Sequence, residues 1–440
     1  MKAVLTTTNL QAGARWQETE LKSGPVEVIR QVSVYPELRY QTFQGFGGAF
    51  TEAAATSWQK LPLERRQALL DSYFGSGGLG YTVGRVHIGS CDFSLGNYAC
   101  QAGPEDEGFD TSRDDENLLP MILAAQKTAG TPIGLMLSPW SPPAFMKTNG
   151  EMNHGGSLKP EYRARWADCM AKYAAHYREA GCDVRLMTVQ NEPAAVQTWD
   201  SCIYSAQEEG EFAAAYLAPA LKEAGCGSVK ILAWDHNKDL LVRRAAGTMS
   251  VPGGVEAVDG FAFHWYTGDH FDAVSHVADR WPDKELWFSE GCVEYSRFDG
   301  MTPLQKAEMY AHDIIGNLNG GIVGSIDWNL LLDAKGGPNH VGNFCEAPAM
   351  LNRDCSDFVL QTEYYYIGQF SRFIRPGAVR LGVSAWSRDL EVTAFENPDG
   401  SRVAVALNRT DGSLPVSATQ NGEVGFTFQM EPHTIATLLM

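Results

Sequence analysis

RLMTVQNEP, residues 185–193, is the stretch from which the fold is most directly predicted. It begins as an apolar run typical of a strand and stops abruptly at Gln-Asn-Glu, after which Pro193 ends any further pairing. A carboxylate at the tip of a buried strand needs a reason, because a buried charge without a partner is costly. Glu192 therefore either caps a loop or pairs with an arginine, or it takes part in catalysis.

Seven other stretches share this strand-like character, and helical patterns lie between most of them. The strand-like stretches are residues 42–48, 81–89, 132–140, 229–237, 258–266, 285–291 and 321–330. The helical patterns cover residues 114–129, 161–180, 205–225, 302–316 and 357–374. Eight largely apolar strands alternating with helices predict a (β/α)8 TIM barrel. The main alternative is an open doubly wound sheet, but no GxGxxG loop follows the first strand.

The two ends of the chain have a different pattern, with short alternating runs and no helices between them. The runs lie at residues 2–7, 26–34, 379–387, 390–397, 402–409, 415–420, 423–430 and 434–440. Pro-Asp-Gly at 398–400, Thr-Asp-Gly at 410–412 and Asn-Gly at 421–422 are turn sequences typical of hairpins. We therefore expect a barrel of residues 41–375 and an antiparallel β-sandwich built from residues 1–40 and 376–440.

Composition and charge exclude several classes of partner. The chain has 440 residues, a formal net charge of −18 and no run of 18 or more apolar residues. An acidic surface repels phosphate backbones and anionic lipid, so we expect neither nucleic acid binding nor stable membrane association. Nine cysteines without CxxC spacing and a beginning without a signal-like apolar core predict a cytoplasmic location, or secretion if a signal was removed.

The carboxyl ends of the eight predicted strands carry polar, aromatic and acidic residues, where a TIM barrel has its active site. These residues are Arg85, His87, Trp140, Asn191, Glu192, Asp235, His236, His264, Trp265, Tyr266, Glu290, Asp327, Trp328 and Asn329. Hydrolysis of a glycosidic bond needs two carboxyl groups, and Glu192 and Glu290 end the fourth and seventh strands. One glutamate after a strand is usually a cap or an ion-pair partner. Two at matching ends, with tryptophans on neighbouring ends, favour catalysis.

A metal site is the alternative chemistry for the same strand ends. Asp235 and His236 together with His87 and His264 offer the ligand types of barrel metallohydrolases. The sequence has no HxH or HExxH spacing in this region. We therefore expect neither a metal nor another cofactor.

Seven motifs, in order along residues 44–344, give the chain a family resemblance. They are QGFGGAFTEAAA (44–55), RVHIGSCDFS (85–94), LSPWSPPAFMKTNG (137–150), VQNEP (189–193), FHWY (263–266), FSEGCVE (288–294) and DWNLLLDAKGGPNHVGNF (327–344). Together they resemble glycoside hydrolase family 30, and within it the glucosylceramidase-like branch related to lysosomal acid β-glucosidase. That family couples a (β/α)8 barrel to a β-sandwich built from both termini, as the strand pattern also predicts.

The resemblance implies a retaining β-glycosidase and a role for each matching residue. Glu192, in the sequence Asn-Glu-Pro, matches the family's acid/base residue, and Glu290 matches its nucleophile. The sugar in the first subsite is expected to contact Asp92, Trp140, Asn191, Trp328 and Asn343. Arg85, His264, Trp265 and Tyr266 match the residues that support the substrate site. If the enzyme retains configuration, its two carboxyl groups lie roughly 5–5.5 Å apart.

Several specificities remain open within this resemblance. A β-glucosidase or glucosylceramidase-like activity is expected first, while β-1,6-glucanase, β-xylosidase and β-fucosidase activities also occur in the family. The loops at residues 95–113 and 194–205 depart from the branch, which leaves the ceramide preference open. A carbohydrate-binding protein with an inert barrel is the alternative from another class.

Overall fold

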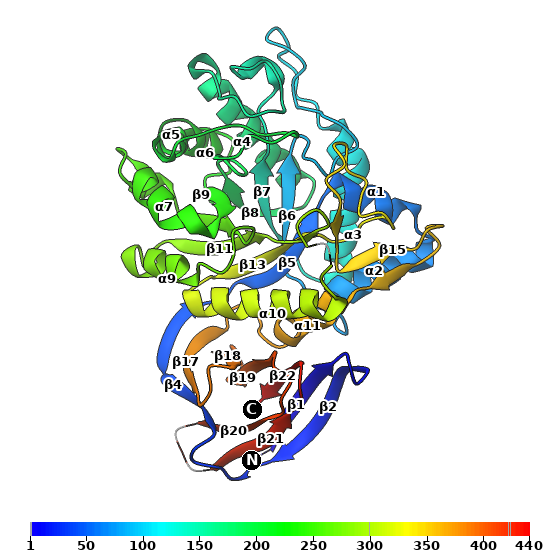
Figure 1. Cartoon of the computed structure of the whole chain (residues 1–440). Coiled ribbons are helices and arrows are strands. Elements are labelled where there is room, and N and C mark those ends of the chain that lie inside the picture. Colours follow the sequence, from blue (N-terminus) through cyan, green and yellow to red (C-terminus); the bar gives the residue numbers. More distant parts are fainter. Residues whose placement is uncertain (1, 299, 421, 423) are drawn as a thin grey trace.

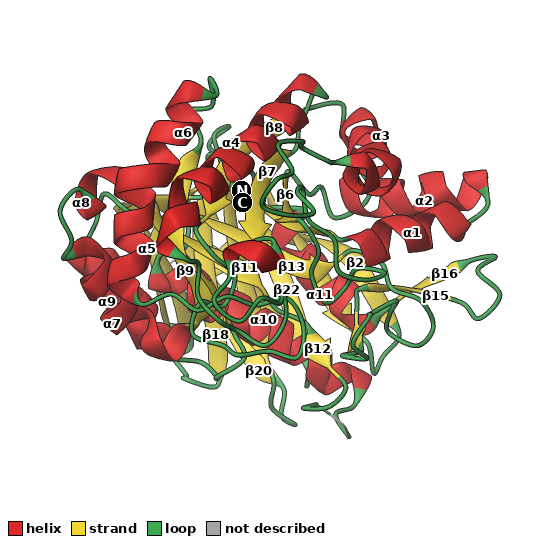
Figure 2. Cartoon of the chain, turned by 90° about the horizontal axis from the view of Figure 1, so that it is seen from above, coloured by secondary structure: helices red, strands yellow, loops and turns green. Residues whose placement is uncertain are grey.

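The computed structural model describes residues 2–298, 300–420, 422 and 424–440, and its larger part is a closed barrel of eight parallel strands (Figures 1 and 2). Around the barrel the strands are β5 (Gly45–Phe50), β6 (Val83–Ile88), β7 (Gly134–Pro139), β8 (Asp183–Thr188), β9 (Lys230–Asn237), β10 (Gly260–His264), β11 (Glu285–Glu290) and β13 (Gly324–Asn329). Each of the eight predicted strands is present, so the predicted (β/α)8 barrel is confirmed.

Helices surround the barrel on its outside (Figure 2). They are α1 (Glu52–Lys60), α2 (Leu63–Phe74), α3 (Leu119–Ala129), α4 (Arg163–Glu179), α5 (Ala206–Phe212), α6 (Ala218–Glu223), α7 (Leu241–Met249), α8 (Gly254–Ala257), α9 (Phe271–Arg280), α10 (Pro303–Gly320) and α11 (Thr362–Ser371). The π-helical turns Asp114–Leu118 and Ala213–Leu217 precede α3 and α6, and short 3-10 turns cover Ala144–Met146, Pro160–Tyr162 and Lys238–Leu240. Within the described residues, none of these helices has the length and apolar character needed to cross a bilayer.

One helix begins later than its sequence pattern predicts. The pattern at residues 357–374 predicts a single helix, but α11 begins only at Thr362. Residues Phe358–Leu360 instead form strand β16, which pairs with β15 (Ala349–Leu351). Pairing with a partner outside the helix competes with the local helical preference of these apolar residues, and here the pairing prevails. The short strands β12 (Val293–Glu294) and β14 (Cys345–Glu346) pair in the same way beside the barrel mouth.

The ends of the chain form one ten-stranded sheet, in the order β2-β1-β22-β19-β18-β17-β4-β20-β21-β3. Its strands are β1 (Lys2–Asn9), β2 (Ala14–Lys22), β3 (Gly24–Pro25), β4 (Gln31–Thr42), β17 (Val379–Ala385), β18 (Leu390–Glu396), β19 (Arg402–Asn408), β20 (Leu414–Gln420), β21 (Val424–Met430) and β22 (Thr434–Leu439). All neighbours are antiparallel except β4 and β20, which pair in parallel. The N-terminal strands join the C-terminal ones, as expected of the β-sandwich.

The prediction for the terminal strands and the description of the structure differ at three places. Strand β2 was not predicted, because most of its side chains face solvent and give no apolar alternation. The run predicted at 26–34 is a strand only from Gln31 onward. Asn421 of the predicted Asn-Gly turn and Glu423 of the run at 423–430 lie outside the described residues. The division of the chain at residues 40 and 375 stays a prediction, and β4 continues through the first of these positions.

Two features of the packing position the functional site. Seven barrel strands each contribute one buried apolar side chain to a layer that fills the barrel interior: Val83, Met136, Leu186, Leu232, Ala262, Trp287 and Ile326. A side chain at Gly324 would collide with Trp287, because a Cβ there would lie 2.1 Å from the indole. The candidate site residues Arg85, Asp235, His264 and Glu290 follow the layer residues along their strands, so they lie on the carboxyl-end side of this layer. On the other side of the barrel, α10 and α11 lie between it and the sandwich (Figure 1).

Candidate active site

A buried aspartate, Asp235 on β9, lies at the centre of the polar side chains at the carboxyl ends of the barrel strands. Its Oδ2 accepts hydrogen bonds from Arg85 Nη2 at 2.7 Å and from Thr188 Oγ1 at 2.8 Å. Its Oδ1 accepts from Ser289 Oγ at 2.7 Å and from His264 Nε2 at 3.1 Å. Burial raises the pKa of Asp235, but the positive charges of Arg85 and His264 outweigh burial and hold it well below the usual range. Asp235 therefore provides a fixed negative charge that orients two cationic side chains.

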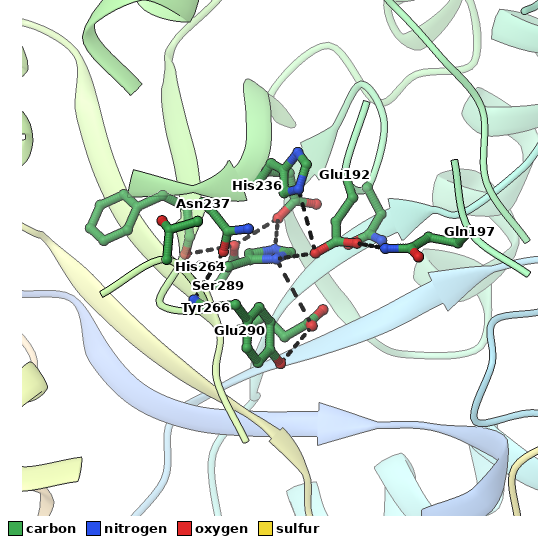
Figure 3. Close-up of polar contacts among 12 residues, drawn as sticks. Glu192, Gln197, His236, Asn237, His264, Tyr266, Ser289 and Glu290 are labelled. Carbon is green, nitrogen blue, oxygen red and sulfur yellow. Dashed lines mark hydrogen bonds and ion pairs between the residues drawn. The ribbon is translucent and has the colours of Figure 1, made fainter. Parts of the chain in front are cut away.

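Glu290, the last residue of β11, is held by two donors, of which Figure 3 shows Tyr266. Arg85 Nη1 donates to Oε2 at 2.6 Å, and the Tyr266 hydroxyl donates to Oε1 at 2.9 Å. His264 Nδ1 lies 3.9 Å from the same Oε1. The planar guanidinium of Arg85 thus contacts Asp235 with one nitrogen and Glu290 with another. Because both contacts are made by one rigid group, the orientation of the Glu290 carboxylate is fixed.

Glu192 reaches the same cavity from an irregular turn that follows β8. Its φ of 46° lies in the left-handed region, which is strained for a residue other than glycine. Its backbone N donates to the Asp235 carbonyl at 3.0 Å, and Asp235 has a φ of 49°. The side chain accepts from Gln197 Nε2 at 3.1 Å and from His264 Nδ1 at 3.3 Å (Figure 3). Backbone strain here coincides with a carboxylate that points into the cavity.

The two carboxylates and the imidazole between them share protons. Burial lowers the pKa of His264, but Glu290, Asp235 and Glu192 outweigh it and raise this pKa to about 9. Burial raises the pKa of Glu192, but His236 and His264 outweigh it and lower this pKa to about 2. The Glu192–His264 pair thus shares one proton, which resides on the imidazole.

One oxygen of Glu192 lies within 4.8 Å of one oxygen of Glu290. A nearest-oxygen distance is somewhat shorter than the separation of the two carboxyl groups. It therefore fits the spacing of about 5–5.5 Å in retaining glycosidases better than the spacing of about 6.5–9.5 Å in inverting ones. The arrangement can place one carboxylate against an anomeric carbon and the other against the leaving oxygen.

Aromatic and amide side chains form the wall opposite the carboxylates. The Trp140 and Trp328 rings stack with centroids 5.3 Å apart, and the Arg85 guanidinium lies 4.7 Å from the Trp140 centroid. Asp92 Oδ2 accepts from Asn339 Nδ2 and from Asn343 Nδ2, each at 3.2 Å. Burial and the charge of Glu290 raise the pKa of Asp92 well above its usual range. Asp92 can therefore donate as well as accept hydrogen bonds with sugar hydroxyls.

The cavity between these groups has a volume of about 120 Å³. Eight of the predicted site residues line it: Asp92, Trp140, Asn191, Glu192, Tyr266, Glu290, Trp328 and Asn343. Arg85 and His264 lie behind the carboxylates and act on them through hydrogen bonds. Trp265 lines a separate cavity beside Tyr266, and its supporting role at the substrate site stays a prediction. Adjacent residues of the irregular segment after β10 point to different sides, which FHWY alone does not reveal.

Nine further residues line the cavity that the sequence did not assign to it: Phe93, Gln197, Trp199, His236, Asn237, Cys292, Glu294, Arg297 and Cys345. Gln197 and Trp199 come from the loop after Glu192, and no motif places that loop over the site. Glu294 is mostly buried beside Arg297, and burial raises its pKa to about 7. His236 has a sequence signal, its position at the end of the fifth predicted strand, but no motif gives it a role in substrate binding.

The alternative of a metal site is not supported by how the ligand types are arranged. Among the described residues, Glu192, His264 and Glu290 bring three possible ligand atoms within 4.8 Å of one another. His264 contacts carboxylates through both ring nitrogens, which suits the protonated ring and leaves it no lone pair for an ion. His87 accepts from the Glu52 backbone N at 3.0 Å and lies 2.5 Å from the Gly89 carbonyl, so both its nitrogens are engaged.

Comparison with protein families matches nearly the whole chain. The family description "Glycosyl hydrolase family 30 TIM-barrel domain" matches residues 43–374. The description "Glycosyl hydrolase family 30 beta sandwich domain" matches residues 377–438. The two matches follow the barrel and the terminal sheet of the structure.

Individual proteins are similar over the full length. The lysosomal acid glucosylceramidase of Mus musculus is 32% identical over 464 residues, which cover 100% of this chain and 90% of that protein. The crystal structure of SrfJ from Salmonella typhimurium is 40% identical, with a TM-score of 0.97 and coverage of 100% and 99%. The endo-β1,6-glucanase BT3312 is 25% identical, with a TM-score of 0.90 and the same coverage.

Proposed function

This chain belongs to glycosyl hydrolase family 30 and is a glycoside hydrolase, and on that premise we propose that it removes a terminal β-glucosyl unit from glucosides with apolar aglycones. The reaction is a double displacement that retains anomeric configuration. The observation that carries this proposal is the close pair Glu192 and Glu290, each held in a different hydrogen-bonding environment. The similarity to a glucosylceramidase supports the choice of substrate.

In the first step Glu290 attacks the anomeric carbon and forms a glycosyl ester. Its Oε2 is held by Arg85 and its Oε1 by Tyr266, so the carboxylate is oriented before substrate arrives. Glu192 protonates the leaving oxygen. The proton shared with His264 crosses from Nδ1 to Oε1, which are 3.3 Å apart, as the leaving oxygen gains charge.

In the second step Glu192 acts as a base toward a water molecule, which attacks the glycosyl ester and releases the sugar. The proton taken from water returns to the Glu192–His264 pair and restores the starting state. The bond between Glu290 and the sugar breaks, and the released carboxylate again accepts the hydrogen bonds of Arg85 and Tyr266. The oxocarbenium-like transition state of both steps lies beside the Glu290 carboxylate, whose charge stabilises it.

The shape of the cavity favours one glycosyl unit. Its volume of about 120 Å³ and its wall of Asp92, Trp140 and Trp328 suit a terminal sugar better than the interior of a polymer. Arg85 Nη2 donates to Asn191 Oδ1 at 2.9 Å, which leaves the amide nitrogen to donate to a sugar hydroxyl.

Exposed apolar side chains at the cavity mouth favour an apolar aglycone. Tyr295 and Phe344 are 39% and 38% exposed and directly follow the lining residues Glu294 and Asn343. Val196, in the loop that carries Gln197, is 67% exposed. Tyr295 and Phe344 are neighbours, since the Tyr295 backbone N donates to the Phe344 carbonyl at 3.2 Å, and such a pair beside a polar cavity supports a binding surface for an apolar group.

A β-1,6-glucanase activity is the second candidate, favoured by the similarity to BT3312 over the full chain. The two candidates differ in the number of sugar units that the site must hold. The first predicts release of glucose from chain ends and from single glucosides, and the second predicts oligosaccharides from within the polymer.

The test compares substrates on the wild type and on Glu290→Gln. We expect release of p-nitrophenol from the β-glucoside, well above the β-xyloside, β-fucoside and β-galactoside, and loss of that release in the variant. Glucosylceramide in detergent micelles and soluble β-1,6-glucan then distinguish the two candidates. Cleavage of the glucan with no release from either glucoside would overturn the proposal in favour of the glucanase.

A further inference from the structure

A further carboxyl group, that of Glu294 in strand β12, lines the active-site cavity. The other carboxyl groups along this cavity belong to Asp92, Glu192 and Glu290. In the antiparallel pairing of β12 with β14, Glu294 lies opposite Cys345, so the two side chains project from the same face of this two-stranded ribbon. Because Cys345 lines the cavity as well, this face of the ribbon is turned toward the substrate.

The carboxyl group of Glu294 is held less firmly than the other three. Its ion-pair partner is Arg297, whose Nε lies 3.6 Å from Glu294 Oε2, beyond the usual hydrogen-bond length of about 2.7–3.2 Å. The Arg297 side chain is 46% exposed and also donates to the Tyr266 carbonyl, and such a long, exposed ion pair contributes little. The other three carboxyl groups each accept two side-chain hydrogen bonds of 3.3 Å or less. The oxygens of Glu294 are therefore available to a ligand.

The surroundings of Glu294 are rich in negative charge. Burial raises the pKa of Glu294 to about 7, and the charges of Glu192 and Glu290 add to this rise while the charge of Arg297 opposes it. Once Glu294 is ionised, a positively charged group of a ligand relieves the repulsion among these carboxylates, and a negatively charged group increases it. This part of the cavity should therefore distinguish ligands by the sign of their charge.

Glu294 lies toward the mouth of the cavity rather than at its floor. Asp92 and Trp140, on the wall expected to hold the sugar, are buried. The side chain of Glu294 is 17% exposed, and the next residue, Tyr295, is one of the exposed aromatic residues at the mouth. With the sugar held at the buried wall, the leaving group extends toward the mouth. Glu294 therefore faces the first atoms of the aglycone beyond the glycosidic oxygen.

We propose that Glu294 is a specificity-determining residue, which accepts a charge-assisted hydrogen bond from an ammonium or hydroxyl group of the aglycone close to the glycosidic oxygen. An aglycone with a carboxylate at that place is rejected. The apolar part of the aglycone lies farther from the sugar, beside the exposed residues of the mouth. This inference rests on the proposed function, since the group that Glu294 recognises belongs to the substrate of the same active site.

The first test compares 2-aminoethyl, 2-hydroxyethyl and carboxymethyl β-glucosides, which are similar in size and differ in charge. Release of glucose at pH 8 gives kcat/KM for the wild type, Glu294→Gln and Glu256→Gln. Comparing the same substrates between variants cancels the intrinsic reactivity of each leaving group. A hydrogen bond to a charged group changes binding about tenfold or more, so the ratio of the aminoethyl to the carboxymethyl glucoside should fall at least tenfold in Glu294→Gln.

Glu256→Gln is the matched control, because it removes one negative charge at an exposed position on α8. It should keep the wild-type ratio, which separates a contact with Glu294 from the general effect of an acidic protein on cations. A ratio in Glu294→Gln that stays within threefold of the wild type overturns the inference. An equal fall in both variants overturns it as well.

The second test does not depend on turnover. Crystals of the wild type and of Glu294→Gln are soaked at pH 8 with 4-bromobenzylammonium, and the anomalous signal of bromine locates the ligand. We expect the ammonium group within about 3 Å of a Glu294 oxygen in the wild type, and loss of the bromine peak in the variant. Bromine at the same place in both crystals, elsewhere, or in neither overturns the inference. If no glucoside is cleaved, the proposed function fails, and the position of the bromine alone then decides the role of Glu294.

Discussion

Tyr266 donates a hydrogen bond to Glu290 Oε1 at 2.9 Å, so a residue just beyond β10 orients the carboxylate at the end of β11. The bond joins a neutral hydroxyl to a charged acceptor, a class worth about 1.5–3 kcal/mol. Tyr266→Phe is therefore expected to lower kcat about 10- to 100-fold on p-nitrophenyl β-glucoside. Tyr364→Phe removes a buried hydroxyl that donates to the Ser72 carbonyl, far from the site, and should leave kcat unchanged. Equal losses in both variants would contradict a role at Glu290.

Replacement of Glu290 tests the nucleophile directly. Glu290→Ala removes the group that forms the glycosyl ester, and we expect kcat to fall by about 10⁴-fold or more. Added azide should occupy the vacated space and attack the anomeric carbon once, giving an α-glycosyl azide that NMR identifies. A β-glycosyl azide, or full activity without azide, would contradict the assignment.

Glu192 is tested by the dependence on the leaving group. Glu192→Ala removes the proton donor, so substrates with poor leaving groups should lose far more activity than those with good ones. We expect the 2,4-dinitrophenyl glucoside to keep a fast first step while methyl glucoside is no longer cleaved. Gln197→Ala removes only a hydrogen bond to Glu192 and serves as the milder comparison. A similar loss on both glucosides would exclude Glu192 as the acid.

The barrel could be predicted from the sequence because its strands are buried on both faces and therefore largely apolar. Strand β7, for example, has the sequence GLMLSP and is buried along its whole length. Strand β2 carries the opposite signal, since its side chains mostly face water, and pairing with β1 alone makes it a strand. The start of helix α11 also could not be predicted from local sequence. Residues that the local pattern assigns to this helix pair with β15 instead.

At the site, the residues at the strand ends could be predicted from the sequence. The loop residues that line the cavity, and the directions in which adjacent side chains point, could not. Glu192 and Glu290 follow from their positions at the ends of strands and from the resemblance. Trp265 and Tyr266 are adjacent in sequence, yet only Tyr266 lines the active-site cavity, while both line the separate cavity beside it. Gln197 reaches Glu192 through a loop whose path depends on contacts with other loops rather than on its own residues.

The proton shared by Glu192 and His264 predicts how pH affects activity. His264 has its pKa raised to about 9, so the pair keeps its proton up to that region in the wild type. In His264→Gln the proton must reside on the Glu192 carboxyl alone, whose unperturbed pKa is about 4.3. The alkaline limb of kcat/KM should therefore move to lower pH by at least one unit, measured with the p-nitrophenyl glucoside. An unmoved alkaline limb would show that His264 does not hold the catalytic proton.

His312 on α10 joins the barrel to the sandwich through several charged neighbours. Its Nδ1 lies 2.5 Å from Glu391 Oε2 and 3.0 Å from Arg409 Nη2, and its Nε2 lies 3.1 Å from Asp269 Oδ2. Burial and Arg409 lower the pKa of His312, but Glu391 and Asp269 outweigh both, so it is raised above the ordinary value. A histidine with a raised folded-state pKa binds its proton more tightly in the folded protein than in the unfolded one.

The stability that His312 contributes should therefore depend on pH. It is fully present below the unfolded pKa of about 6.5 and is lost as pH rises through the raised folded value. His312→Gln should lower the free energy of unfolding in urea by about 1–2 kcal/mol at pH 6, and by clearly less at pH 9. His276→Gln, an exposed position on α9, should cost little at either pH. If the loss in His312→Gln were equal at the two pH values, the contact would act through packing rather than through the charge on the imidazole.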